Sequence, residues 1–150
     1  MNIIYLTYHE IDKKKWDDCI QHAVNGLIYA ESVYLDHLAA NWHALILGDY
    51  EAVMPLTWKR KWGIQYLYQP AFIQQGGIFS RKKLSEKTTR SFIEMASLKF
   101  RFAEININYL NIINAEKGIQ IKKRNNYVLE LGAGYNKISS KYNVYIKQRL

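Results

Sequence analysis

The residues best suited to bind a ligand are amides and tyrosines placed around one glycine pair, Gly76-Gly77. Tyrosine hydroxyls and glutamine amides can hydrogen-bond a peptide or a nucleotide, and glycine lets a ligand approach the backbone closely. The simpler interpretation is a hairpin whose amides face solvent. The candidate substrate-binding residues in this stretch are Tyr66, Tyr68, Gln69, Gln74 and Gln75.

A second candidate lies just upstream, where residues 58–62 interleave aromatic and basic side chains in the run WKRKW. Indole rings can stack on bases while cations contact phosphates, as in proteins that bind single-stranded nucleic acid. The alternative is an exposed loop whose tryptophans cover a sheet. We keep Trp58 as a sixth candidate substrate-binding residue.

Metal binding and nucleophilic catalysis find no support in the sequence. The four histidines have no metal-ligand spacing, and the single cysteine, Cys19, falls on the apolar face of an expected helix. No Ser/His/Asp or Cys/His set can be nominated, so the catalytic residues stay unassigned. We expect no metal and no tightly bound cofactor.

The elements that must position these residues centre on a β-hairpin. The apolar residues 44–47, the turn Gly48-Asp49 and the return over 51–56 predict two antiparallel strands. Proline cannot donate a ladder hydrogen bond, so Pro55 should mark an edge, a bulge or the place where two strands part. A parted ladder leaves backbone groups free for a ligand. Residues 64–69 and 72–79 are expected to add two further short strands.

Helices and strands alternate around this centre. Apolar residues at helical spacing predict a helix that Asp12 caps and that ends near Asn25-Gly26, and two further helices that Ser32 and Ser85 cap. Strands are expected over 2–7 and 103–109, the latter with alternating apolar and polar residues, then a hairpin over 119–122 and 127–131 and a last helix over 135–150. This order predicts an α+β (mixed α/β) domain with a largely antiparallel central sheet flanked by helices.

The net charge of +8 is unevenly distributed along the 150 residues. Residues 1–75 carry 6 Lys/Arg and 8 Asp/Glu, whereas residues 76–150 carry 15 and 5. Such a basic half attracts polyanions, although a solvated lysine-rich face without a partner is equally compatible. No apolar run approaches the ~20 residues that span a bilayer, and no signal peptide precedes the first strand. We expect a soluble cytoplasmic protein with no membrane span.

The order of elements resembles the GNAT (acyl-CoA N-acyltransferase) fold. In detail the chain is more similar to the first half of FemABX-like proteins, which carry two such folds in tandem. The similarity covers most of the chain, and its short motifs are Trp16-Asp17, Met54-Pro55-Leu56, Tyr68-Gln69-Pro70, Gln75-Gly76-Gly77 and the segment 127–131.

The resemblance implies a single GNAT-like domain over 1–150, as the N-terminal, acceptor-binding half of a longer two-domain protein or as a half that forms a homodimer. It would help move an acyl or aminoacyl group from acyl-CoA or aminoacyl-tRNA to an amine on a small molecule or peptide. One departure is that no Q/R-x-x-G-x-G/A phosphate loop follows residues 103–109.

Two alternatives remain. The first is a non-catalytic binding module whose basic surface holds RNA or another polyanion. The second comes from residues 128–134, VLELGAG, which resemble the first motif of S-adenosylmethionine-dependent methyltransferases. Only sixteen residues follow that motif, too few for the strands and helices that would complete such a site.

Overall fold

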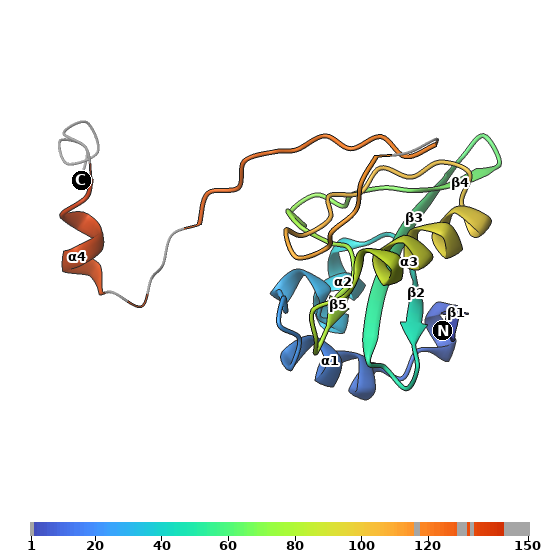
Figure 1. Ribbon diagram of the computed structural model, residues 1–150, viewed down its shortest axis with the longest axis horizontal. Helices are drawn as coiled ribbons and strands as arrows, with labels where there is room; N and C mark the ends of the chain where they lie inside the picture. The colour runs from blue at the N-terminus through green and yellow to red at the C-terminus, as the bar shows by residue number, and fades with distance from the viewer. Residues whose placement is uncertain (1, 116–117, 129–131, 133, 143–150) are drawn as a thin grey trace. The chain divides into compact units, whose positions relative to one another are not determined.

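The computed structural model describes residues 2–115, 118–128, 132 and 134–142. The chain divides into two compact units, Met1–Asn114 and Ala115–Leu150, and each is described here by itself (Figure 1). The sheet and all candidate substrate-binding residues belong to the first unit.

The sheet of the first unit has five strands and is antiparallel throughout. Strands β1 (Ile3–Leu6), β2 (Trp42–Leu47), β3 (Ala52–Lys61) and β4 (Ile64–Leu67) lie side by side in this order, and β5 (Phe79–Ser80) pairs with the start of β3. The predicted hairpin over 44–56 is therefore confirmed as β2 and β3, with Ala44 opposite Pro55. The predicted α+β class, with an antiparallel sheet flanked by helices, is also confirmed.

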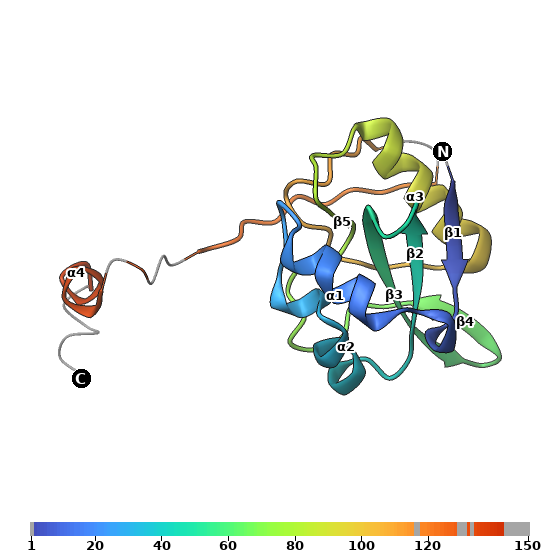
Figure 2. The same ribbon diagram turned by 90° about the horizontal axis from the view of Figure 1, so that it is seen from below.

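Helices cover both faces of the sheet because successive residues of its strands point to opposite sides. On one face, Ala44, Ile46 and Val53 pack with residues of α1 (Lys13–Gln21) and α2 (Ser32–Leu38). On the other face, Leu45, Met54 and the rest of a second cluster pack with α3 (Glu86–Lys99). The unit is thus a three-layer arrangement with the sheet in the middle (Figure 2).

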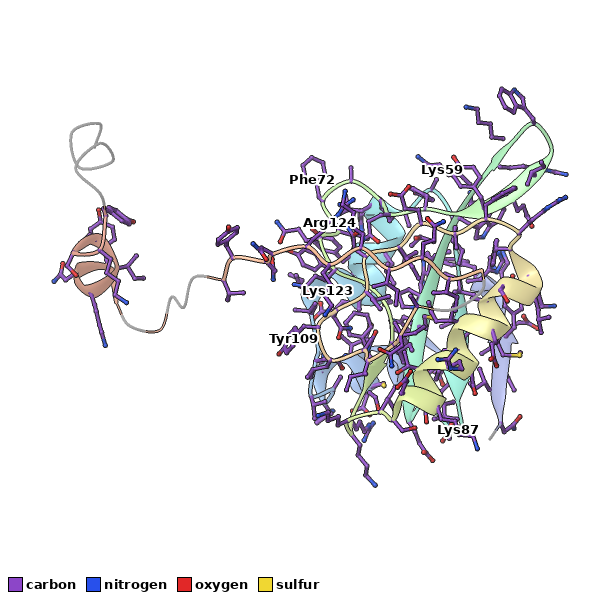
Figure 3. All side chains as sticks on the ribbon, turned by 45° about the horizontal axis from the view of Figure 1, so that its top comes forward. Lys59, Phe72, Lys87, Tyr109, Lys123 and Arg124 are labelled. Carbon is purple, nitrogen blue, oxygen red and sulfur yellow. The ribbon has the colours of Figure 1, made fainter. Side chains whose placement is uncertain are left out.

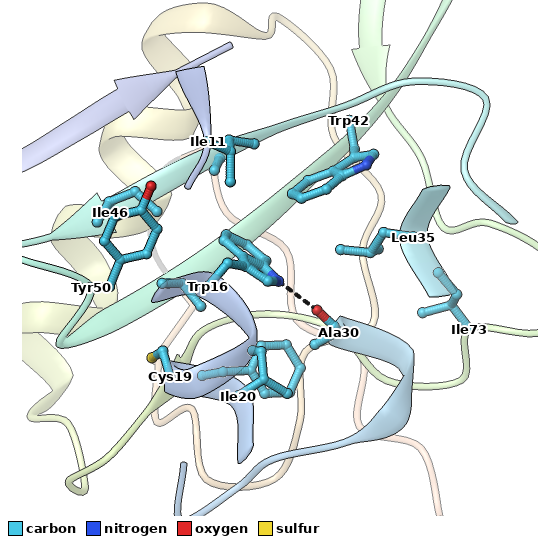
Figure 4. Packing of buried hydrophobic residues seen from close by; sticks show 13 residues of the cluster. Ile11, Trp16, Cys19, Ile20, Ala30, Leu35, Trp42, Ile46, Tyr50 and Ile73 are labelled. Carbon is cyan, nitrogen blue, oxygen red and sulfur yellow. Dashed lines mark hydrogen bonds between the residues drawn. The ribbon is translucent and has the colours of Figure 1, made fainter. Parts of the chain in front are cut away.

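Trp16 lies at the centre of the core beside α1 (Figure 4). Its side chain is fully buried, its ring centre lies 5.1 Å from that of Trp42, and its indole N–H donates to the carbonyl of Ala30 at 2.7 Å. Burial of a large aromatic ring with its one polar atom satisfied is strongly stabilising. This contact fixes α1 against the short 3-10 helix Ile28–Ala30.

The helix starts follow the predicted caps in two of three cases. Asp12 accepts hydrogen bonds from the N–H groups of Lys14 and Lys15, and Ser85 accepts one from Thr88. Ser32, in contrast, is the first residue of α2 rather than its cap, and its N–H and hydroxyl both donate to Asp17 on α1.

The end of α1 was predicted too late along the chain. The helix stops at Gln21, before Asn25-Gly26. The side chain of Asn25 is buried, where it hydrogen-bonds the backbone of residues 78 and 80. A tertiary contact therefore sets the path of the chain after α1.

Two of the predicted strands are absent from the described structure. Residues 72–79 form regular strand only at Phe79–Ser80, since Phe72 and Gly77 have positive φ angles of 67° and 91°. Residues 103–109 make only isolated parallel bridges, from Ala103 to Leu67 and from Ile107 to Gly76.

The faces predicted for residues 103–109 were also wrong. Asn108 is buried and Tyr109 is 79% exposed, the reverse of the expected alternation. The reason is that Asn108 turns inward to bond backbone groups of the neighbouring segment.

The second unit contains one described helix, α4 (Tyr135–Ser139), shorter than the predicted 135–150, of which 143–150 lie outside the described residues. The predicted strands over 119–122 and 127–128 do not form, and residues 129–131 of that hairpin also lie outside the described part. Tyr127 and Val128 are 90% and 85% exposed, and a two-stranded hairpin that buries so little is not stable. Within the described residues, no helix combines the length and apolar character that crossing a membrane requires.

Candidate functional site

The candidate site lies where β3 loses its strand partners on the side away from β2. There β5 pairs only with Ala52 and Val53, and β4 pairs from Trp58 onward. Residues 54–56 between them have a strand partner only in β2. The prediction that Pro55 marks the place where two strands part is confirmed.

Two prolines explain why neither ladder continues into the gap. Extending the β3–β4 register from Trp58↔Leu67 would set Pro55 opposite Pro70, and neither residue has an N–H to donate. The ladder accordingly stops at residue 57, where the Tyr68 N–H donates to the Thr57 carbonyl at 3.1 Å. Extending the β3–β5 register from Val53↔Phe79 would set Pro55 opposite Gly77, again with one donor missing. Pro55 is therefore the point at which both ladders fail.

A small cavity borders this gap on the face that α1 and α2 cover. It is lined by Pro55 and Thr57 from β3, by Leu35 from α2 and by residues from the 69–79 segment, among them Gln69, Ile73 and Gly76. Its volume of about 20 Å³ corresponds to roughly one water molecule. A guest larger than a single small group would need the surrounding segment to move.

The segment beside the cavity is held by Gln69, one of the predicted substrate-binding residues. Its amide N–H donates to the Ile73 carbonyl at 2.6 Å, and its amide oxygen accepts from the Asn106 N–H at 2.9 Å. The Gly76 N–H in turn donates to the Asn106 carbonyl at 2.6 Å. Both ends of the Gln69 amide are thus engaged in shaping the cavity wall.

Three buried asparagines replace the strand partner that residues 76–80 lack. The Ile78 carbonyl accepts from the amides of Asn25 and Asn111, both at 2.8 Å, and from that of Asn108 at 3.3 Å. The Ile78 N–H donates to the Asn111 amide oxygen at 2.7 Å. We call Asn25, Asn108 and Asn111 the asparagine clamp. Buried backbone groups need partners, and here side-chain amides supply them.

Sequence reasoning missed the asparagine clamp. Asn25 had the pattern of a helix end, and Asn108 fell on the expected polar face of a strand. The signal that could have found them is chemical: three amides lie in segments that must pack near a backbone interrupted by Gly76-Gly77 and by proline.

Tyr66 and Tyr68 lie on the same face of the sheet as the cavity. Tyr66 is opposite Lys59, and the Lys59 ammonium lies 4.3 Å from the ring centre of Tyr68. The Tyr68 hydroxyl accepts from the Ala40 N–H at 3.1 Å, and the Thr57 hydroxyl donates to the Tyr68 carbonyl at 2.6 Å. The structure therefore brings Tyr66, Tyr68 and Gln69 together along one side of the gap.

The remaining three candidates lie elsewhere. Gln74 is exposed and Gln75 half-buried, and within the described part of the chain neither side chain makes a hydrogen bond. Trp58 points to the opposite face, where it packs with the cluster beside α3. Its ring stacks on His43 with centres 5.3 Å apart, and His43 stacks on Tyr5 at 5.5 Å.

The stack around His43 is poor in polar partners. His43 Nδ1 and Trp58 Nε1 are buried without a hydrogen-bond partner among the described residues. Burial lowers the pKa of His43 from its usual 6.5, and the nearby Glu10 carboxylate opposes that shift. The imidazole is therefore neutral in the folded protein at neutral pH.

Neither a metal centre nor a reactive thiol is found in the described residues. They contain no group of three or more His, Cys, Asp or Glu side chains placed to hold a metal ion. Cys19 is fully buried, and burial raises the pKa of its thiol to about 11. A thiol that stays protonated at neutral pH is a poor nucleophile.

Comparison of the chain with profiles of known protein families, with curated proteins and with solved structures finds no match. The gap at Pro55, its cavity and the asparagine clamp are thus the features from which a function must be inferred.

Proposed function

We propose that the first unit is the acceptor-binding half of a FemABX-like N-acyltransferase, which moves an acyl or aminoacyl group from acyl-CoA or aminoacyl-tRNA to an amine. One observation supports this above the others: β3 loses its partners at Pro55, next to a cavity, in a sheet whose element order is similar to that of GNAT proteins. Main-chain polar groups beside a broken ladder are available to a ligand.

In this proposal the protein accelerates transfer mainly by orientation. The acceptor lies over Tyr66 and Tyr68, with its amine directed toward the cavity at Pro55. Holding an amine at the right angle to a thioester or ester carbonyl removes much of the entropic barrier, and backbone N–H groups can stabilise the oxyanion that develops. No described side chain is assigned as the base.

Calorimetric titration of the chain with acetyl-CoA and with a nucleotide-linked muropeptide tests the proposal. Binding of the muropeptide should shift the backbone amide NMR signals of residues 52–57 and 70–77 and leave those of α1 in place. The absence of heat with both compounds would remove the transferase proposal.

A variant of Tyr66 sharpens the test, because its hydroxyl is free to bind a ligand, with no hydrogen bond to the described protein atoms. Tyr66→Phe removes that hydroxyl alone and should weaken muropeptide binding by roughly 3- to 10-fold, the worth of one neutral hydrogen bond. Tyr109→Phe is the matched control, since Tyr109 is 79% exposed on a different loop.

The rival function is a non-catalytic module that binds RNA or another polyanion. It is favoured by residues 115–150, which carry eight Lys/Arg against two Asp/Glu. Titration with tRNA at several salt concentrations separates the two, because a polyanion module shows a linear fall of log affinity with log salt and no response to the muropeptide.

A further inference from the structure

The turn that joins β3 to β4 contains a residue that neither its backbone conformation nor its packing explains. Trp62 and Gly63 have φ angles of 49° and 80°, and they follow Lys61, which pairs with Ile64. A two-residue turn with positive φ at both positions favours Asn-Gly, because a bulky side chain is strained there. Trp62 nevertheless occupies it and is 89% exposed. Its side chain therefore gains little from burial.

The cations of the hairpin are not neutralised by neighbouring carboxylates. Lys59, Arg60 and Lys61 are exposed, and none forms a salt bridge within the part of the chain that the structure describes. The sequence has no Asp or Glu between residues 52 and 85. In Figure 1 this hairpin extends beyond the rest of the sheet, so its positive charge is presented to solvent.

Aromatic rings and ammonium groups share one face of the hairpin. Lys59 pairs with Tyr66, and Lys61 with Ile64, so these four side chains point the same way. The ring centres of Tyr66 and Tyr68 lie 6.5 Å apart, and the Lys61 ammonium lies 4.6 Å from the centre of the Trp62 ring. Flat rings that alternate with cations are the combination that binds bases and phosphates together.

We infer that this hairpin binds single-stranded nucleic acid, with Trp62 and Tyr66 stacking on unpaired bases and Lys59 and Lys61 contacting phosphates. Duplex nucleic acid fits less well, because its bases are already stacked on one another. An anionic membrane also fits less well, since three cations accompany only Trp62 and Ile64 as apolar groups at the tip.

The hairpin surface is separate from the cavity at Pro55. Trp62 lies five residues beyond Thr57, or roughly 17 Å along a strand at ~3.4 Å per residue. The inference therefore does not depend on the transferase proposal.

The test measures the fluorescence anisotropy of a labelled oligo(dT) strand titrated with the full chain. Trp62→Asn should weaken binding roughly tenfold, the effect of losing one stacked base. Because asparagine favours the turn conformation, this variant should melt at the same temperature as the parent or higher, which separates lost binding from lost folding. Trp62→Phe should retain most of the affinity.

The charge component is tested by the salt dependence of the same titration. Replacing both Lys59 and Lys61 with alanine should lower the slope of log affinity against log salt by about 1.4, at ~0.7 for each phosphate contact on a single strand. Lys87→Ala is the control, since Lys87 lies at the start of α3, away from Lys59 (Figure 3). It should leave both slope and affinity nearly unchanged.

Three results would overturn the inference. The first is no binding of oligo(dT) at low salt. The second is binding that Trp62→Asn leaves intact, which would assign it to the basic residues 115–150 instead. The third is Trp62-dependent binding to phosphatidylserine vesicles without Trp62-dependent binding to the oligonucleotide, which would identify a membrane contact.

Discussion

Replacing Gly77 with alanine tests whether the asparagine clamp holds the chain beside Pro55. Gly77 has a φ of 91°, and an added Cβ would overlap the amide oxygen of Asn111 and lie 3.1 Å from the Ile107 Cβ. The Asn111 amide makes two hydrogen bonds with the backbone of Ile78, at 2.7 and 2.8 Å. It cannot move aside without breaking both.

The expected loss of stability follows from these contacts. Positive φ in a residue with a Cβ costs roughly 1–2 kcal/mol, and each buried group left without its hydrogen bond costs roughly 1–3 kcal/mol. One strained residue and two lost bonds, at the lower ends of these ranges, lower the free energy of unfolding by about 3 kcal/mol. In a domain of this size, that lowers Tm by about 12 °C or more.

Urea unfolding, followed by tryptophan fluorescence, measures this change, and two other glycines provide matched controls. At Gly63 the φ of 80° is equally unfavourable but nothing lies within 4 Å of an added Cβ, so Gly63→Ala should cost only the strain, about 1 kcal/mol. At Gly76 the φ lies outside that region and the nearest atom is 3.7 Å away, so Gly76→Ala should change stability by less than about 0.5 kcal/mol.

The comparison among the three glycines decides the question. If Gly77→Ala costs no more than Gly63→Ala, then Asn111 moves freely, and its hydrogen bonds do not hold residues 76–80. The account of how the gap at Pro55 is bordered would then be wrong, whatever the absolute stabilities are.

Three further predictions concern the core, a helix cap and a titrating ring. Trp16→Phe should lower the free energy of unfolding by about 2–3 kcal/mol in urea, because it opens a void and leaves the Ala30 carbonyl without its donor. Asp12→Ala should cost about 1 kcal/mol in the same assay, since two N–H groups at the start of α1 lose their acceptor. Because burial lowers the folded-state pKa of His43, the unfolded chain binds the proton more readily, so stability should fall as the pH drops below 6.5. Thermal unfolding above and below that pH should show a smaller drop in His43→Phe, and an equal drop would exclude His43 as its source.

The parts of the fold with local signals could be predicted from the sequence. Asp12 and Ser85 cap helices because their side chains bond N–H groups two or three residues away, and the β2–β3 hairpin follows from alternation around a glycine turn. Pro55 was likewise informative, because the missing N–H is a property of the residue itself. These features need no knowledge of distant segments.

What could not be predicted depends on partners far along the chain. Residues 103–109 alternate as a strand does, yet they bridge their neighbours only at Ala103 and Ile107. Asn108 turns inward because the backbone of Gly76 and Ile78 offers unpaired groups some 30 residues away. Alternation describes one strand alone, whereas burial of an amide depends on which distant backbone groups lack a partner.

The gap itself shows where sequence reasoning stops. Both prolines are visible in the sequence, but their effect depends on the register that sets Pro55 opposite Pro70, and a shift of one residue would place a donor there instead. The turn at Trp62-Gly63 fixes that register, because a two-residue loop leaves Lys61 opposite Ile64 and every later pair follows from it. The same hairpin that presents aromatic and basic side chains to solvent therefore also determines that the ladder ends at Thr57. A residue inserted into its turn should change the opening beside Pro55 as well as the exposed tip.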